Sequence, residues 1–189
     1  MIEQVASAVQ WARLFVSGAL YPGAVAIDAT AGNGQDTVFL ARLVGESGLV
    51  YAFDLQEQAI RNTAERLTAA GLASRVKLLH ADHARLQEFV SQPVQAVMFN
   101  LGYLPGGDRN IVTRPQTTGE ALEQALALLA PGGRMSVVVY TGHRGAGGEA
   151  RLVAAILAGL EQKQYLVLQM NYWNGPHDAP VIYLIARQV

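Results

Sequence analysis

The sequence contains no cysteine, almost no net charge and no long hydrophobic run, and each absence excludes a class of protein. Without cysteine among 189 residues, the chain can form no disulfide, no thiolate nucleophile and no Cys-ligated zinc site. A net charge of −1 means that nucleic acid would have to be bound by a local patch, not by a general positive field. No apolar stretch approaches the roughly 20 residues of a membrane span, and no signal peptide is evident. We therefore expect a cytoplasmic protein with neither a membrane partner nor a bound metal.

What the sequence does contain is typical of a globular α/β protein. It is 51% hydrophobic and 15% charged, which argues against disorder, and its length suits one domain over residues 1–189. Apolar runs and periodicity predict strands over residues 24–27, 49–53, 76–80, 94–99, 135–140, 165–170 and 181–186. Helices are predicted over residues 2–17, 34–44, 56–70 and about 149–160, with one more that Thr117 or Thr118 caps and that runs to Leu129. Glycine and proline predict a loop over residues 100–116 and a turn over residues 131–133.

The order of these elements predicts how the strands pair. Strands alternate with helices over the first five units, which favours parallel pairing with right-handed crossovers. The last two strands have no helix between them, so we expect them to form an antiparallel hairpin. The predicted fold is therefore α/β, a Rossmann-like doubly wound sheet of seven mostly parallel strands with a C-terminal antiparallel hairpin.

The stretch DATAGNGQD, residues 28–36, directly follows the first predicted strand. In a doubly wound sheet, ligands bind beyond the carboxyl ends of the strands. Gly32 and Gly34 would let the backbone approach a ligand, and the helix that follows offers free N–H groups. This turn is therefore a candidate site for a phosphate or a carboxylate, with an ordinary tight strand–helix turn as the alternative.

Polar residues at the ends of the next two strands extend this candidate site. Asp54, at the end of the second strand, can accept hydrogen bonds from ribose hydroxyls. Asp82 and His83, at the end of the third strand, could contact the amino group of an adenine ring. The dinucleotide-binding pattern G-x-G-x-x-G is incomplete, because Thr37 stands where its third glycine belongs. In addition, the acidic residues Asp28 and Asp36 flank the turn and favour a cationic ligand over a pyrophosphate. We therefore expect S-adenosylmethionine as the cofactor, in preference to NAD. The candidate cofactor residues are Asp28, Thr30, Gly32, Asn33, Gly34, Asp36, Thr37, Asp54, Gln56, Asp82 and His83.

The turn over residues 28–34 resembles the acidic-x-Gly-x-Gly-x-Gly turn of class I methyltransferases, with Thr30 in place of the first glycine. The seven-strand order that ends in an antiparallel hairpin is also similar to their fold. The resemblance implies a class I methyltransferase that uses S-adenosylmethionine.

A second candidate segment, Asn100 to Tyr103, follows the fourth strand. It resembles the Asn/Asp-Pro-Pro-aromatic segment of methyltransferases that act on amino nitrogens, with Leu101 and Gly102 replacing the prolines. The Asn100 oxygen and a backbone carbonyl could accept N–H bonds from a target amine and aim its lone pair, while the Tyr103 ring could stack on the substrate. The alternative is a glycine-rich connector with Tyr103 in the core.

Two further loops are predicted at the substrate edge. His143, after the fifth strand, could bind substrate or accept a proton, or could be a solvated loop residue. We take Asn100, Tyr103 and His143 as the candidate catalytic residues. In the loop over residues 171–180, substrate contacts and structural roles are equally open for Asn171, Tyr172, Trp173 and His177.

Residues 28–37, 51–56, 99–108 and 140–145 together resemble one narrower family, described as "putative rRNA methylase" and including the MnmM-type tRNA methyltransferases. FNLGYLPGGD, residues 99–108, is the most specific element. The resemblance implies methylation of the aminomethyl group of 5-aminomethyl-2-thiouridine at the tRNA wobble position, with the anticodon stem-loop as partner. An anticodon loop suits this chemistry because its bases can be splayed out and stacked on aromatic rings. The candidate substrate residues are Leu101, Gly102, Arg109, Arg114 and Arg144.

Three other functions stay open from the residues alone. They are an rRNA or small-molecule amine methyltransferase, an NAD-binding oxidoreductase and a non-catalytic adenosine-binding module. The sequence does not give the oligomeric state, so a homodimer also stays open.

Overall fold

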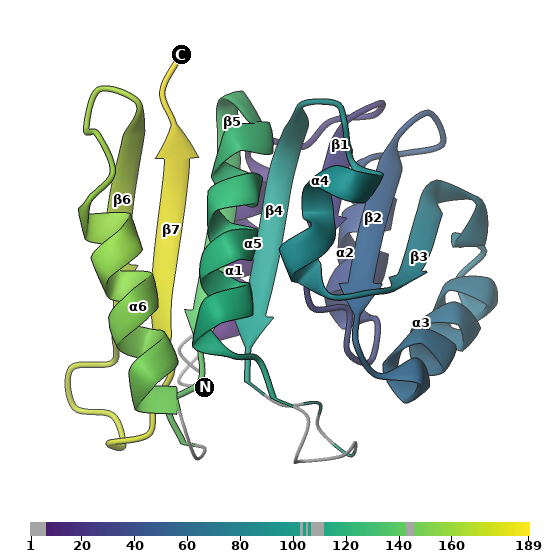
Figure 1. Ribbon diagram of the computed structural model, residues 1–189. Helices are drawn as coiled ribbons and strands as arrows, with labels where there is room; N and C mark the ends of the chain where they lie inside the picture. The colour runs from purple at the N-terminus through teal and green to yellow at the C-terminus, as the bar shows by residue number, and fades with distance from the viewer. Residues whose placement is uncertain (1–6, 103, 105, 107–111, 143–145) are drawn as a thin grey trace, which may run out of the picture.

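A computed structural model describes residues 7–102, 104, 106, 112–142 and 146–189 (Figure 1). Within these residues, seven strands form one sheet. They are β1 (Val25–Asp28), β2 (Leu49–Asp54), β3 (Val76–His80), β4 (Val94–Leu101), β5 (Leu129–Val139), β6 (Tyr165–Met170) and β7 (Val181–Arg187). Their order across the sheet is β3-β2-β1-β4-β5-β7-β6.

The pairing directions confirm the predicted fold class. Strands β1 to β5 pair in parallel, while β7 is antiparallel to both β5 and β6. The strand order reverses between β1 and β4, and this reversal is the place where doubly wound sheets bind ligands. The carboxyl ends of the parallel strands all lie at the lower edge of the sheet in Figure 1.

Helices cover both faces of the sheet. On one face are α1 (Ala8–Ser17), α2 (Gln35–Leu43) and α3 (Glu57–Ala69); on the other are the short α4 (Leu86–Phe89), α5 (Pro115–Leu128) and α6 (Ala146–Ala158). Successive residues of β4 show why its sequence is almost wholly apolar: Met98 packs in the core under α1 and α2, and Phe99 in the core under α5 and α6. Both faces of a central strand are buried, so apolar residues do not alternate with polar ones.

Some predicted boundaries were wrong, and the structure gives the reasons. Helix α5 begins at Pro115 after Arg114, not at a threonine cap, because proline's fixed φ suits the first helical turn. Thr118 lies inside the helix instead, where its hydroxyl donates to Glu149 on α6 at 2.6 Å. Strand β5 starts at Leu129 and includes the residues predicted as a turn, with a shift in register against β4.

The remaining differences concern the first helix and short elements. Helix α1 begins at Ala8, where Ser7 and Gln10 form a capping box; the predicted start at residue 2 lies outside the described residues. Helix α4 and two 3₁₀ turns, Ala73–Arg75 and His83–Arg85, were not predicted, because single turns carry too little periodicity to detect.

Candidate functional site

A cavity of about 370 Å³ opens at the carboxyl edge of the sheet, where β1, β2 and β4 end. Many of the residues that the sequence singled out line it. They are Thr30, Gly32, Asn33, Asp36, Asp54, Gln56, His83, Asn100 and Gly102. The topology therefore brings together the turn after β1, the end of β2, the 3₁₀ turn after β3 and the segment after β4.

Other candidate residues lie elsewhere. Asp28, Gly34, Thr37, Asp82, Leu101 and Arg114 are not among the lining residues that the structure describes. Leu101 is fully buried in the core under α5 and α6, and Arg114 is exposed at the start of α5. Tyr103, Arg109, His143 and Arg144 lie outside the described residues.

Asp28 braces the turn after β1 from behind the cavity. Its carboxylate accepts hydrogen bonds from the Thr30 backbone N–H at 3.2 Å and from the Thr37 hydroxyl at 2.6 Å. The side chain is completely buried. Burial, and then the nearby charge of Asp36, raise the pKa of Asp28 to about 7. We infer that Asp28 shapes the turn and does not contact the ligand.

The two glycines of this turn have different reasons to be glycine. Both have positive φ, +54° at Gly32 and +77° at Gly34. A Cβ at Gly34 would lie 2.9 Å from the Cα of Thr63 on α3, so this position is needed for close packing between the turn and α3. Gly32 lines the cavity, where the absence of a side chain leaves room for a ligand.

Asp54 ties the end of β2 to the first turn. Its two carboxylate oxygens accept hydrogen bonds from the backbone N–H groups of Gly32 and Gln56, each at 2.9 Å. Burial raises its pKa, and these two hydrogen bonds act in the opposite direction. A carboxylate can accept about four hydrogen bonds, so a cavity ligand with hydroxyl groups could still donate to Asp54.

His83 lines the cavity, and one of its ring nitrogens is buried without a hydrogen-bond partner among the described residues. Its Nδ1 lies 3.2 Å from the carbonyl oxygen of Ala29, which can only accept, so we assign the ring hydrogen to Nδ1. Nε2 is buried without a hydrogen-bond partner among the described residues. Burial lowers the pKa of His83, which keeps the imidazole neutral and Nε2 available as an acceptor. An amino group in the cavity would satisfy it.

Asn100 presents a second unpaired acceptor. Its Nδ2 donates to Asp36 Oδ2 at 2.7 Å, and because a carboxylate can only accept, this contact fixes which way the amide faces. Oδ1 is buried and has no hydrogen-bond partner within the described part of the chain. A buried amide oxygen without a partner is costly, and an N–H donor from a ligand would satisfy it.

Thr30, which replaces the first glycine of the class I methyltransferase turn, connects the turn after β1 to the segment that begins at Asn100. Its hydroxyl oxygen accepts a hydrogen bond from the Asn100 backbone N–H at 2.7 Å. A glycine could not make this contact. The residue that departs from the class I pattern therefore helps to hold Asn100 in place.

Sequence reasoning missed Arg13 on α1. Its Nε donates to Asp36 Oδ1 at 2.5 Å, and its guanidinium lies over the Phe39 ring. Arg13, Asp36 and Asn100 therefore form a continuous chain of hydrogen bonds along the cavity wall. The sequence carried no signal for this contact, because it depends on how α1 packs across the sheet.

Several other lining residues were also missed. They include Leu55, Leu104, Thr113 and Tyr140. Tyr140 directly follows β5 at the same edge, and this position was the signal that could have identified it. Thr113 donates its backbone N–H to the Gly102 carbonyl at 3.0 Å and its hydroxyl to the buried Glu149 at 2.8 Å, which anchors the segment beyond the cavity to α6.

Comparisons with known proteins identify the family. Residues 50–186 match the family described as "Putative rRNA methylase". The chain belongs to this family. The resemblance drawn from the sequence is therefore confirmed.

Two proteins that are similar to nearly the whole chain carry names from methyl-transfer chemistry. A protein of Arabidopsis thaliana, named tRNA (mnm(5)s(2)U34)-methyltransferase, chloroplastic, is 38% identical over 176 residues, or 88% of this chain. The chain spans 64% of the length of that relative. A crystal structure from Clostridium thermocellum, described as "putative rRNA-methylase", has a TM-score of 0.94 at 40% identity, covering 97% of this chain and 99% of its own.

A second solved structure contains a ligand. A methyltransferase-like protein from Streptococcus mutans, in complex with SAH, has a TM-score of 0.89 at 34% identity and covers 97% of this chain and 99% of its own. These relatives agree with the class of enzyme that the sequence predicted. None of the helices in the described part of the chain has both the length and the apolar character that crossing a membrane requires.

Proposed function

We propose that this protein is an S-adenosylmethionine-dependent N-methyltransferase, acting as one domain over residues 1–189. Its proposed substrate is the aminomethyl group of 5-aminomethyl-2-thiouridine at the tRNA wobble position. The observation that carries the proposal is the Asn100 side chain. Its amide is held by Asp36, and its oxygen is a fixed acceptor without a partner among the described residues.

The cavity has donor and acceptor groups that suit the cofactor. Asp54 at the end of β2 would accept from ribose hydroxyls, and His83 Nε2 would accept from the adenine amino group. Asp36 lines the cavity but is ion-paired with Arg13, so Asp54 is the acidic lining residue that favours a cationic ligand over a pyrophosphate. Ribose and adenine are common to S-adenosylmethionine and NAD, and the SAH bound to the Streptococcus mutans relative supports the former.

The chain's own part in the reaction is to hold the amine. When bound, S-adenosylmethionine supplies a methyl group attached to a positively charged sulfur. Asn100 Oδ1 would accept one amine N–H bond, which turns the nitrogen lone pair toward that methyl group. The lone pair forms the new N–C bond, the electrons of the broken C–S bond stay on sulfur, and the nitrogen then releases a proton to solvent. A neutral amine needs no strong base for this step, which is consistent with the proposed role of Asn100 as an aiming group.

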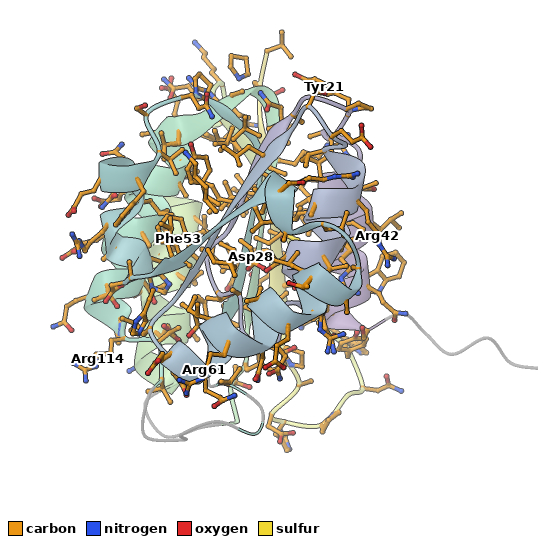
Figure 2. All side chains as sticks on the ribbon, turned by 90° about the vertical axis from the view of Figure 1, so that its right-hand side faces the viewer. Tyr21, Asp28, Arg42, Phe53, Arg61 and Arg114 are labelled. Atoms are coloured by element: carbon orange, nitrogen blue, oxygen red, sulfur yellow. The ribbon has the colours of Figure 1, made fainter. Side chains whose placement is uncertain are left out.

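The choice of tRNA rests on the relatives and on this amine chemistry. The Arabidopsis relative is named for a modified wobble uridine, whereas the family description names rRNA. An aminomethyl group is the kind of target that the Asn100 acceptor suits. We propose that Arg109, Arg114 and Arg144 contact backbone phosphates, since phosphate contacts position RNA without reading its sequence. Arg114 is exposed at the lower edge of the molecule in Figure 2, as that role requires.

The proposal can be tested with purified protein and two tRNA preparations. One carries 5-aminomethyl-2-thiouridine at the wobble position, and the other is an unmodified transcript of the same tRNA. We expect nucleoside mass spectrometry to detect one added methyl group on the wobble nucleoside of the first and none on the second. Methylation of rRNA, with no methylation of either tRNA, would replace the substrate but keep the enzyme class. Titration calorimetry that detects NAD binding and no S-adenosylmethionine binding would overturn the proposal.

A further inference from the structure

Trp173 is an exposed aromatic side chain in a loop at the same edge of the sheet as the candidate site. It is 96% exposed, whereas tryptophan is normally well buried because of its large apolar surface. It lies in the connection between β6 and β7, which is at the same edge of the sheet as the carboxyl ends of β1, β2 and β4 (Figure 1). At this exposure the indole ring adds almost no buried area to the part of the chain that the structure describes.

Local structure holds this ring outward. The backbone N–H of Gly175 donates to the Tyr172 carbonyl at 3.1 Å, which closes a tight turn with Trp173 at its tip. A Cβ at Gly175 would lie 2.8 Å from the Tyr172 Cβ, so the turn is closely packed. A second turn follows, closed by the Ala179 N–H and the Pro176 carbonyl at 2.9 Å. Two successive turns therefore present Trp173 on a defined backbone.

The same loop is anchored to the rim of the cavity. The Thr141 hydroxyl donates to the Ala179 carbonyl at 3.3 Å, directly after Tyr140, which lines the cavity. Burial, Asp36 and then Tyr172 raise the pKa of Tyr140, so Tyr172 lies within electrostatic reach of the cavity wall. Trp173 is the next residue along the chain. The loop that carries Trp173 is thus fixed at the rim of the cavity by the hydrogen bond between Thr141 and Ala179.

The surroundings of Trp173 indicate what it would contact. Its exposed neighbours in the loop include the polar Asn171, Asn174 and His177, whereas the exposed apolar side chains of Leu166, Val167 and Leu168 lie on strand β6 and not in this loop. A single exposed ring among polar groups suits an unpaired nucleobase, whose flat face stacks while its edges contact polar atoms. The chain's net charge of −1 gives little general attraction for RNA, so stacking would supply affinity that charge does not.

We propose that Trp173 stacks on an unpaired base of the RNA substrate, next to the nucleotide whose amine enters the cavity. This inference rests on the proposed function, because it takes the substrate to be an RNA with a single-stranded loop. It assigns Trp173 to substrate binding and not to methyl transfer or cofactor binding.

Steady-state kinetics with tRNA carrying 5-aminomethyl-2-thiouridine test the proposal. We expect Trp173→Ala to raise the KM for tRNA about tenfold, while kcat and the affinity for S-adenosylmethionine stay within about twofold of wild type. Trp173→Phe should retain most of the affinity, because it keeps a stacking ring. Tyr21→Ala is the matched control: Tyr21 is 55% exposed and lies at the opposite edge of the molecule in Figure 2, so its loss should change nothing.

Fluorescence gives a second, independent measurement. The chain has two tryptophans, so Trp173→Phe leaves Trp11 as the only one. We expect an anticodon stem-loop to quench wild-type fluorescence in a saturable way, and neither the stem duplex alone nor the Trp173→Phe variant to give this quenching. If wild type methylates tRNA but Trp173→Ala keeps the wild-type KM, this inference alone is overturned. If wild type methylates no RNA, the proposed function fails, and the inference fails with it.

Discussion

The amide of Asn100 donates to Asp36 Oδ2 at 2.7 Å, and this one contact determines which atom of the Asn100 side chain is left without a partner among the described residues. An asparagine amide has two ends of similar shape but opposite hydrogen-bonding character. Because the carboxylate of Asp36 can only accept, the nitrogen of Asn100 must face it. The oxygen is thereby left as the acceptor, and in the proposed reaction Asp36 would act through the orientation of Asn100.

The first prediction concerns the position of the Asn100 oxygen. We expect Asn100→Ala to bind S-adenosylmethionine with wild-type affinity and to lose about 100-fold in kcat, since the amine is no longer aimed. Asn100→Gln is the informative companion, because it keeps the amide but moves the oxygen by one methylene group, and we expect a similar loss. Single-turnover rates and calorimetry measure the two effects separately. Wild-type turnover in either variant would exclude the aiming role.

Arg13 should influence the rate through Asp36 and Asn100. Removing it leaves the buried Asp36 carboxylate without its cation, which we expect to lower the free energy of unfolding by roughly 1–3 kcal/mol. We also expect Arg13→Ala to lower kcat about tenfold with little change in the KM for tRNA, because Asn100 is less firmly held. Urea denaturation and kinetics measure the two effects.

Arg13→Lys separates positioning from structure. A lysine can restore the charge next to Asp36 but not the guanidinium geometry, so stability should recover more than kcat does. If the lysine variant recovered both to the same extent, or if Arg13→Ala changed stability alone, a positioning role for Arg13 would be excluded.

The location of the site could be predicted from the sequence because strand ends are easy to identify. Asp28, Asp54 and Asn100 each come at or near the end of a buried apolar run, and parallel strands bring such ends to one edge of a sheet. The order of strands and helices was enough to predict the fold class for the same reason. The local sequence pattern was therefore enough to predict at which edge of the sheet the site lies and which strands contribute to it.

The roles of individual residues depended on contacts that local pattern does not contain. Thr118 has the character of a helix cap, yet its hydroxyl donates to Glu149, 31 residues further along the chain. Gly34 suits a ligand-binding turn, yet its lack of a side chain is required by Thr63 on α3. Arg13 belongs to an amphipathic helix whose pattern gives a buried face but not the strand or loop it packs against. Tertiary packing decided each of these cases.

Asp54 should be needed for cofactor affinity. We expect Asp54→Asn to weaken S-adenosylmethionine binding about tenfold or more, because an amide has one acceptor oxygen where the carboxylate has two charged ones. The backbone N–H of Gly32 or of Gln56 would also lose its acceptor, which should disturb the turn. Glu57→Gln is the matched control, since Glu57 is the exposed acidic residue at the start of α3. Calorimetry that finds equal affinity in Asp54→Asn and Glu57→Gln would contradict the assignment.

Asp28 should make the stability of the protein depend on pH. Burial, and then the charge of Asp36, raise its pKa from 3.8 to about 7, so between these values the folded chain binds a proton that the unfolded chain does not. This contribution to stability is fully present at low pH and is lost as pH rises through about 7, by up to about 1.4 kcal/mol for each pH unit crossed. Asp28→Asn has no proton to lose and keeps the shape of the protonated acid, and the Thr37 hydroxyl can accept from its amide.

We therefore expect urea denaturation at pH 5.0 and pH 7.5 to show that wild type loses more stability than Asp28→Asn between the two. The free energy of unfolding of the variant, relative to that of wild type, should therefore be higher at pH 7.5 than at pH 5.0. At the higher pH only wild type must either keep a proton or bury a charge. Other titrating groups affect both proteins alike, so the difference between the two pH profiles isolates Asp28. Parallel profiles would mean that the Asp28 carboxylate ionises as readily in the folded chain as in the unfolded one. The turn after β1 would then be braced by a charge and not by a protonated acid.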